Sequence, residues 1–142
     1  MMRHRWLLYT LFALCCNGTL LADESPVLEE IQAYLDFATY GEGAISSEQV
    51  NEAGLSAFQF IDTRNAQQYA KEHLADAMNI EWREILLRRD EIPKERPVVL
   101  YCDTGLLSSK AQFMLRLAGF DNVKVLLGGF DAWRSYRSDI KK

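Results

Sequence analysis

The stretch VVLYCDTGLLSS, from Val98 to Ser109, decides how the rest of this chain is interpreted. Its four apolar, β-prone residues predict a buried strand that ends at Cys102, and Gly105 supplies a turn before Ser108 begins a helix. In open α/β sheets, ligands bind beyond the carboxyl ends of the strands. The sequence therefore places Cys102 where ligand binding and chemistry are expected.

Cys102 has two interpretations at this point. Backbone N–H groups of the turn that follows it, aligned at a helix N-terminus, form a cradle that stabilises a negatively charged sulfur or a bound anion. The other interpretation is a small apolar residue at the end of a buried strand, since free cysteines are among the most buried residue types. Strand end, glycine turn and helix start together favour a nucleophile.

Strand and helix patterns alternate along the chain, which predicts an α/β fold. The strand candidates are continuous apolar runs, which is typical of a mainly parallel sheet with helices on both faces. The expected strands lie within 57–62, 77–82, 98–102 and 122–129, and the expected helices at 26–39, 65–74, 83–90, 108–118 and 130–137, with a further short helix from Glu48 capped by Ser46 or Ser47 and a linker or turn at 41–43.

The N-terminus has the layout of a secretory signal peptide over residues 1–22. Arg3 and Arg5 precede an apolar run that is shorter than the roughly 20 residues of a membrane span, so cleavage and export to the periplasm are expected, with no membrane contact afterwards. An uncleaved N-terminal anchor is the alternative. The rest of the chain divides into an N-terminal helix and linker at 23–44, one domain at 45–137 and a tail at 138–142.

Charge and cysteine content exclude several classes of function. The 142 residues carry a net charge of −4, and removal of residues 1–22 leaves 14 basic and 20 acidic side chains, a net charge of −6. A nucleic-acid partner is therefore not expected, because phosphate binding relies on clustered Lys and Arg. Cleavage also leaves Cys102 as the one cysteine of the original three, so no second thiol is available to a thiol oxidoreductase.

Several further motifs appear in a recognisable order. Asp62 and Arg64 match an Asp-x-Arg motif, EHLADAMNI at 72–80 matches Gly-His-Ile-x-Gly-Ala-x-Asn-Ile, and GGFDAW at 128–133 matches Gly-Gly-x-x-x-Trp. Together with the Cys102 loop they resemble a single-domain rhodanese, from about residue 45 to residue 137. The resemblance implies a rhodanese-like three-layer α/β fold.

The same resemblance implies a sulfurtransferase. Cys102 would take a sulfane sulfur from a small donor, become a persulfide, and pass the sulfur to a thiol or a protein acceptor. It implies structural roles for Asp62, Arg64, His73 and Trp133, and no metal or organic cofactor. The implied substrate-binding residues are those whose loop surrounds the sulfur, namely Asp103, Thr104, Gly105, Leu106, Leu107 and Ser108.

The loop departs from the family pattern Cys-x-x-Gly-x-Arg, because its sixth residue is Leu107. A leucine cannot make the charge-assisted hydrogen bonds with which arginine holds a sulfonate or thiosulfate, a loss of about 1.5–3 kcal/mol. Asp103 adds a negative charge next to the nucleophile. Thiosulfate is thus a doubtful donor, a neutral or low-molecular-weight persulfide is favoured, and an inactive binding or regulatory module is the alternative. The expected helix at 83–90 offers three arginines, Arg83, Arg88 and Arg89, that could replace the missing charge.

Overall fold

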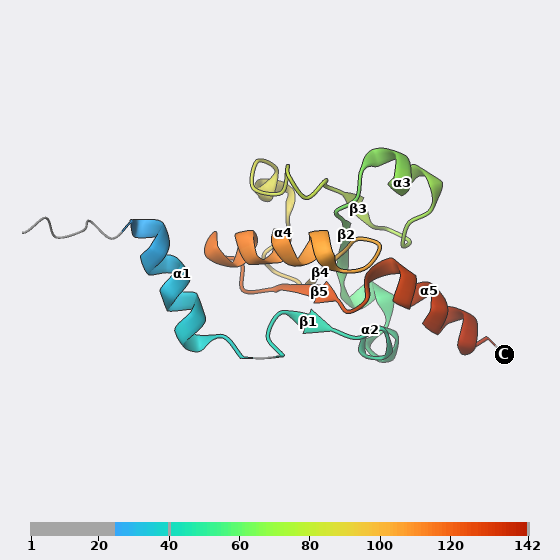
Figure 1. The fold of residues 1–142 in the computed structure, drawn as a ribbon. Helices are drawn as coiled ribbons and strands as arrows, with labels where there is room; N and C mark the ends of the chain where they lie inside the picture. Colours follow the sequence, from blue (N-terminus) through green and yellow to red (C-terminus); the bar gives the residue numbers. More distant parts are fainter. Residues whose placement is uncertain (1–24, 40, 142) are drawn as a thin grey trace, which may run out of the picture.

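A computed structural model describes residues 25–39 and 41–141, so the expected signal peptide at 1–22 lies outside the described residues. Its centre is a five-stranded sheet in the order β1-β5-β4-β2-β3, with every neighbouring pair parallel (Figure 1). This confirms the parallel α/β fold expected from the sequence. The strands are β1 (Ala44–Ile45), β2 (Gln59–Asp62), β3 (Met78–Asn79), β4 (Val98–Tyr101) and β5 (Val123–Leu126).

Helices cover both faces of the sheet. The α-helices are α1 (Pro26–Phe37), α2 (Ser47–Ala53), α3 (Ala66–Lys71), α4 (Leu106–Leu117) and α5 (Gly129–Asp139), and two short 3-10 helices are η1 (Leu55–Ala57) and η2 (Arg89–Glu91). Figure 1 shows α4 on one side of β4 and β5 and α2 on the other. Buried residues of α5 share a hydrophobic core with those of α2. The parallel crossovers require this arrangement, because each connecting helix must pack back onto the sheet.

Strand β4 shows how one short strand supplies two hydrophobic cores. Its four side chains are fully buried and alternate in direction, as successive residues of a strand do. Val98 and Leu100 join the core beneath α4, whereas Val99 and Tyr101 join the core beneath α2 and α5. A strand buried on both faces reads as a continuous apolar run, which is the pattern that identified it.

Two helices, α2 and α3, begin at side chains that cap them. Ser46 caps α2 with a full capping box, since its hydroxyl accepts from the Gln49 N–H and the Gln49 side chain accepts from the Ser46 N–H. Asn65 caps α3 through a hydrogen bond from the Gln68 N–H (2.9 Å). These local bonds satisfy helix N–H groups that lack an intrahelical partner.

The structure corrects the sequence interpretation at several places. The glycine-rich turn expected at 41–43 is present, but it leads into β1, a two-residue strand that was not expected and that pairs with β5. The expected helix at 83–90 is a series of turns followed by η2. Helix α4 begins at Leu106, two residues before the expected start at Ser108, and α5 extends to Asp139.

Helix α1 lies beside α4 and keeps much of its apolar surface exposed (Figure 1). The ring of Tyr34 meets the ring of Phe113 edge-on, 5.2 Å between centroids, and this contact packs α1 against the domain. None of the helices in the described residues is long and apolar enough to cross a membrane.

Candidate active site

Cys102 follows β4 directly and its sulfur is surrounded by donors. The thiol is free, the residue is 2% exposed, and the Sγ accepts hydrogen bonds from the N–H groups of Gly105 (3.2 Å) and Leu107 (3.3 Å). Two backbone dipoles thus point their positive ends at one sulfur. This arrangement stabilises negative charge on the sulfur without any charged side chain.

Gly105 makes the cradle possible. Its φ of +99° is in the left-handed region, which a residue with a Cβ adopts only at a cost, and it stands at the N-cap of α4. The Leu107 N–H belongs to the first turn of α4 and has no intrahelical partner, so it is available to the sulfur. The positive end of the α4 dipole therefore faces Cys102.

The Ser108 hydroxyl is a third potential donor to the sulfur. It lies 3.8 Å from the Cys102 Sγ and 3.0 Å from the Gly105 carbonyl oxygen. That carbonyl oxygen already accepts from the Ser109 hydroxyl (2.8 Å) and the Ser109 N–H (2.9 Å). Because the Gly105 carbonyl oxygen keeps these two hydrogen bonds, it remains satisfied when the Ser108 hydroxyl turns toward a charged sulfur.

The opposite side of the loop is fastened to α5. The Phe130 N–H donates to the Cys102 carbonyl oxygen (2.8 Å), and the Asp131 N–H donates to the Asp103 carbonyl oxygen (3.0 Å). Gly129 permits this approach, since an added Cβ would lie 2.5 Å from both carbonyl oxygens. The GGFDAW motif therefore acts on the site by letting the start of α5 dock on the backbone of the cysteine loop.

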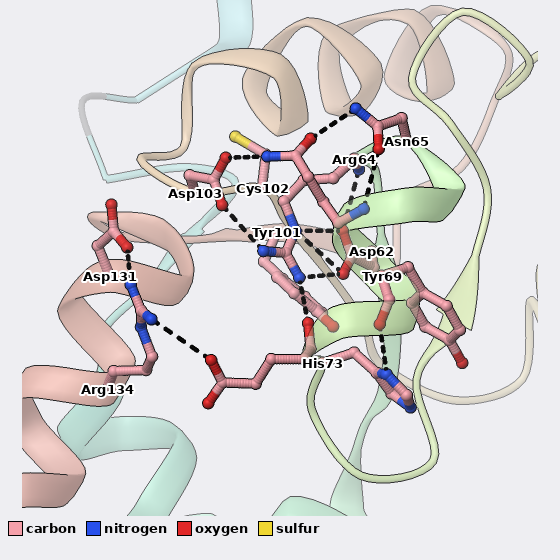
Figure 2. Close-up of polar contacts among 12 residues, drawn as sticks. Asp62, Arg64, Asn65, Tyr69, His73, Tyr101, Cys102, Asp103, Asp131 and Arg134 are labelled. Carbon is pink, nitrogen blue, oxygen red and sulfur yellow. Dashed lines mark hydrogen bonds and ion pairs between the residues drawn. The ribbon is translucent and has the colours of Figure 1, made fainter.

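The Asp103 side chain points toward Arg64 rather than over the cradle. Its carboxylate accepts hydrogen bonds from the Arg64 guanidinium (2.9 Å) and from the Gln68 amide (2.7 Å). Figure 2 shows Arg64 reaching from Asp62 to Asp103. The negative charge expected beside the nucleophile is therefore directed toward Arg64, whose single positive charge is shared between Asp103 and Asp62.

Arg64 is the centre of this network. It is 6% exposed, bonds the fully buried Asp62 carboxylate through two nitrogens, donates to the Glu72 carbonyl oxygen, and stacks on Phe130. Hydrogen bonds to Asp62 raise the pKa of the Arg64 guanidinium above its usual range. The Asp-x-Arg motif is therefore a buried ion pair. The remaining guanidinium nitrogen of Arg64, Nη1, donates to Asp103 and thereby holds the cysteine loop.

Tyr101, the last residue of β4, lies next to the Arg64 guanidinium. Its hydroxyl accepts from the Leu74 N–H (3.0 Å), and burial, together with the nearby Asp62 carboxylate, raises the pKa of the phenol above its usual range. The phenol is therefore a neutral hydrogen-bonding group, and it ties the chain after α3 to the strand that carries Cys102.

The remaining loop side chains line the mouth of the cradle. Thr104 is exposed, Leu106 is 66% exposed, and Leu107 is half-buried without belonging to either hydrophobic core. Leu107 thus leaves the loop apolar at the position where the family commonly has arginine.

The three arginines at 83–90 are occupied elsewhere. Arg88 pairs with Glu91 (2.7 Å) and Glu84 (3.5 Å), Arg89 donates to the Leu86 carbonyl oxygen, and Arg83 is held by Glu81. The structure therefore brings none of them to the Cys102 sulfur.

His73 and Trp133 lie away from the sulfur. His73 is exposed, stacks on Tyr69 at 3.9 Å between ring centroids, and its Nδ1 lies 2.8 Å from the Tyr69 carbonyl oxygen. Trp133 is buried in the core beneath α5. In the described part of the chain, no group of three or more His, Cys, Asp or Glu side chains is arranged to hold a metal ion.

Two residues of the site were not identified from the sequence. Gln68 anchors Asp103, and Gly129 brings α5 onto the loop. Gln68 carries no local signal, since its partner is 35 residues away. Gly129 belonged to a recognised motif, but the close approach it allows becomes visible only in three dimensions.

Comparison with known proteins identifies the family of this chain. Residues 46–136 match the model of the rhodanese-like domain, and this chain belongs to that family.

Its relatives and structural neighbours agree. The chain is 32% identical over 83 residues to thiosulfate sulfurtransferase GlpE of Coxiella burnetii (57% of this chain, 78% of that protein) and 37% identical over 73 residues to a sulfurtransferase of Allochromatium vinosum (51% and 68%). Among solved structures, a rhodanese-related protein from Thermoplasma volcanium has a TM-score of 0.61 at 20% identity, covering 66% of this chain and 91% of that one. The rhodanese-like domain of an Anabaena protein has a TM-score of 0.59 at 27% identity, covering 67% and 75%.

Proposed function

We propose that the protein is a sulfurtransferase or persulfide carrier that works through Cys102. The observation that carries the proposal is the pair of backbone N–H groups, from Gly105 and Leu107, directed at the Cys102 Sγ. Such a cradle stabilises the negative charge that the sulfur carries when it attacks a donor. The sulfurtransferase names of two relatives support the same activity.

The chemistry is a displacement at sulfur. The Cys102 thiolate attacks the outer sulfur of a donor R–S–S–H, a bond forms between Sγ and that sulfur, and the bond to the inner sulfur breaks with R–S⁻ as the leaving group. The enzyme then carries a Cys102 persulfide, whose charge the same N–H groups stabilise. An acceptor thiolate attacks the outer sulfur in turn and restores the Cys102 thiolate.

Thiosulfate is a poor donor in this proposal. Its sulfonate carries charge directly beside the transferred sulfur, and the apolar Leu107 occupies the position from which the family commonly contacts that charge. Losing such a contact costs about 1.5–3 kcal/mol, which is roughly ten- to a hundredfold in donor affinity. Because Cys102 is almost fully buried, a slim terminal sulfur is the group best able to reach it.

Intact-mass measurement tests the proposal. The protein is incubated with thiosulfate, mercaptopyruvate or glutathione persulfide, and we expect one added sulfur atom with at least one donor, removed again by excess thiol. The Cys102→Ser variant should gain none. If no donor adds sulfur to the unmodified protein, sulfur transfer through Cys102 is refuted.

A second candidate function is a catalytically inactive binding module. The observation in its favour is that four apolar side chains of α1 are exposed, namely Val27, Leu28, Leu35 and Phe37. In this case Cys102→Ser leaves partner capture from cell extract unchanged, whereas Leu35→Glu abolishes it. Loss of capture in Cys102→Ser argues against the binding module.

Export is part of the proposal, on the basis of the sequence pattern at residues 1–22. With a C-terminal tag, the protein is expected in the periplasmic fraction of a bacterial host, with a mass that corresponds to a chain shortened near Ala22. A full-length protein in the cytoplasmic fraction would contradict it.

A further inference from the structure

A cationic groove runs from the cysteine loop along α5. It consists of a cavity of about 170 Å³, lined among others by Lys71, Asp103 and Arg134, and a neighbouring cavity of about 540 Å³, lined among others by Arg137 and Lys141. The two cavities share Glu72, Phe130 and Arg134 in their walls, so we describe them together as the α5 groove. A volume of this size suits a small molecule rather than a protein surface.

The charge of the groove is opposite to that of the protein. Five cations line the groove, Arg64, Lys71, Arg134, Arg137 and Lys141, against two carboxylates, those of Glu72 and Asp103, in a chain with a net charge of −4. Lys71 and Lys141 form no ion pair within the described residues. A local field of this sign attracts an anionic ligand.

Arg134 is available to a ligand even though it has partners. It pairs with Glu72 (3.3 Å) and Asp131 (2.6 Å), and all three side chains are about half exposed. Exposed pairs contribute little and exchange readily, so a ligand carboxylate can replace either partner. The Arg134 guanidinium also lies over the Phe130 ring (5.3 Å) and that of Arg137 over the Trp133 ring (5.7 Å). Stacking on buried rings limits the motion of both groups and leaves their N–H edges, rather than their faces, to bond carboxylates.

The groove and the sulfur cradle differ in the charge that they accept. The cradle holds the sulfur with backbone dipoles and is bordered by Leu106 and Leu107, so it has no side-chain cation for a charged sulfur group. The groove begins at Asp103, the residue after the nucleophile, and carries the cations. A matching donor is therefore uncharged around its transferred sulfur and anionic at its other end.

We propose that the α5 groove binds the carboxylates of a low-molecular-weight persulfide while its terminal sulfur enters the Cys102 cradle. This inference rests on the proposed sulfur-transfer function and names the class of donor. A tripeptide-sized persulfide spans about 10 Å, and one wall of the groove is Asp103, the residue that follows the nucleophile. The displacement is the one described above: the donor loses its outer sulfur to Cys102 and leaves as a thiolate.

Two donors with the same skeleton test this proposal. Glutathione persulfide has two free carboxylates, and the persulfide of glutathione diethyl ester has none. For the unmodified protein, we expect the rate constant of persulfide formation at Cys102 to be about a hundredfold higher with the free acid, since two charge-assisted contacts are worth about tenfold each. Lys71→Gln and Arg134→Gln should each lower the ratio of the two rate constants by about tenfold. Lys124→Gln, which removes an exposed cation of β5, should leave the ratio unchanged.

A non-reacting probe separates this proposal from the proposed function. S-methylglutathione cannot transfer sulfur, so its binding is followed by shifts of the backbone amide resonances of α3 and α5. Binding that is lost in Lys71→Gln, combined with no persulfide in any experiment, supports the groove and refutes sulfur transfer. Persulfide formation with an acid-to-ester ratio near one in the unmodified protein, or a ratio unaffected by Lys71→Gln and Arg134→Gln, overturns the groove and leaves sulfur transfer intact.

Discussion

Gly129→Ala tests how the cysteine loop is held in place. Gly129 has a φ of +62°, and an added Cβ would lie 2.5 Å from the carbonyl oxygens of both Cys102 and Asp103. These are backbone atoms, so they cannot rotate away as a flexible side chain can. The substitution must therefore separate α5 from the loop by moving one of them.

The size of the effect follows from what is lost. Moving α5 away weakens two hydrogen bonds, from the N–H groups of Phe130 and Asp131, at about 0.5–1.5 kcal/mol each. An alanine in the left-handed region costs a further 1–2 kcal/mol, roughly. The free energy of unfolding should thus fall by about 2–5 kcal/mol in total.

Gly119→Ala is the matched control. Gly119 has a φ of +84°, but nothing lies within 4 Å of an added Cβ. The free energy of unfolding of Gly119→Ala should fall only by the backbone cost of about 1–2 kcal/mol. The difference between the two variants isolates the docking of α5 on the loop.

Urea denaturation followed by tryptophan fluorescence gives the two unfolding free energies. The rate constant of persulfide formation at Cys102 should fall in Gly129→Ala and stay unchanged in Gly119→Ala, because only the first displaces the Cys102 backbone. Equal destabilisation of both variants would refute the steric reasoning. An unchanged persulfidation rate in a folded Gly129→Ala protein would show that docking on α5 does not position the sulfur.

Three further substitutions test other parts of the site. Leu107→Arg should raise kcat/KM for thiosulfate by roughly ten- to a hundredfold, because it restores a charge-assisted contact; Leu106→Arg, on the exposed side, is the control, and an equal rise in both variants would indicate general attraction of the anion instead. Ser108→Ala should leave the unfolding free energy within about 1 kcal/mol and slow persulfide formation about fivefold, the loss of one hydrogen bond to a charged sulfur; no change in rate would exclude the hydroxyl as a donor. Arg64→Met should lower the unfolding free energy by about 3–5 kcal/mol in urea denaturation, because the fully buried Asp62 is left without its cation; a loss below about 1 kcal/mol would mean that the buried pair is not structural.

The parts of the fold that the sequence predicted are those with a strong local signal. The run before Cys102 is long and apolar enough to identify β4, and Asn65 caps α3 through bonds within three residues. Strand β1 was not predicted because it has only two residues, Ala44 and Ile45. It is a strand because it pairs with β5, and not because of any local pattern.

The segment after β3 was mistaken for a helix for a related reason. Arg88 pairs with Glu84 and Glu91, at the spacings that favour a helix. Yet the fully buried Ile85 is drawn into the core beneath α4, and the chain follows it in turns. Tertiary burial outweighs pairs that are each worth a few tenths of a kcal/mol.

Within the site, the direction of the Asp103 side chain could not be predicted from the sequence. A sequence reveals that a carboxylate follows the nucleophile but not which way it points. The partners that turn it away from the cradle, Arg64 and Gln68, are 39 and 35 residues distant. Cys102 and Gly105, by contrast, are three residues apart, and their relation is set by one turn.

In this loop, stabilisation of the Cys102 sulfur and selection of the sulfur donor depend on different groups. The cradle is built from the N–H groups of Gly105 and Leu107, and a backbone donor does not depend on which side chain stands at position 107. The charge that selects a donor does depend on that side chain. We therefore expect replacement of Leu107 to change which donor is used and to leave the intrinsic reactivity of Cys102 unchanged, as measured by alkylation with neutral iodoacetamide. If Leu107→Arg altered that alkylation rate as strongly as thiosulfate turnover, selection and activation would not be separate in this loop.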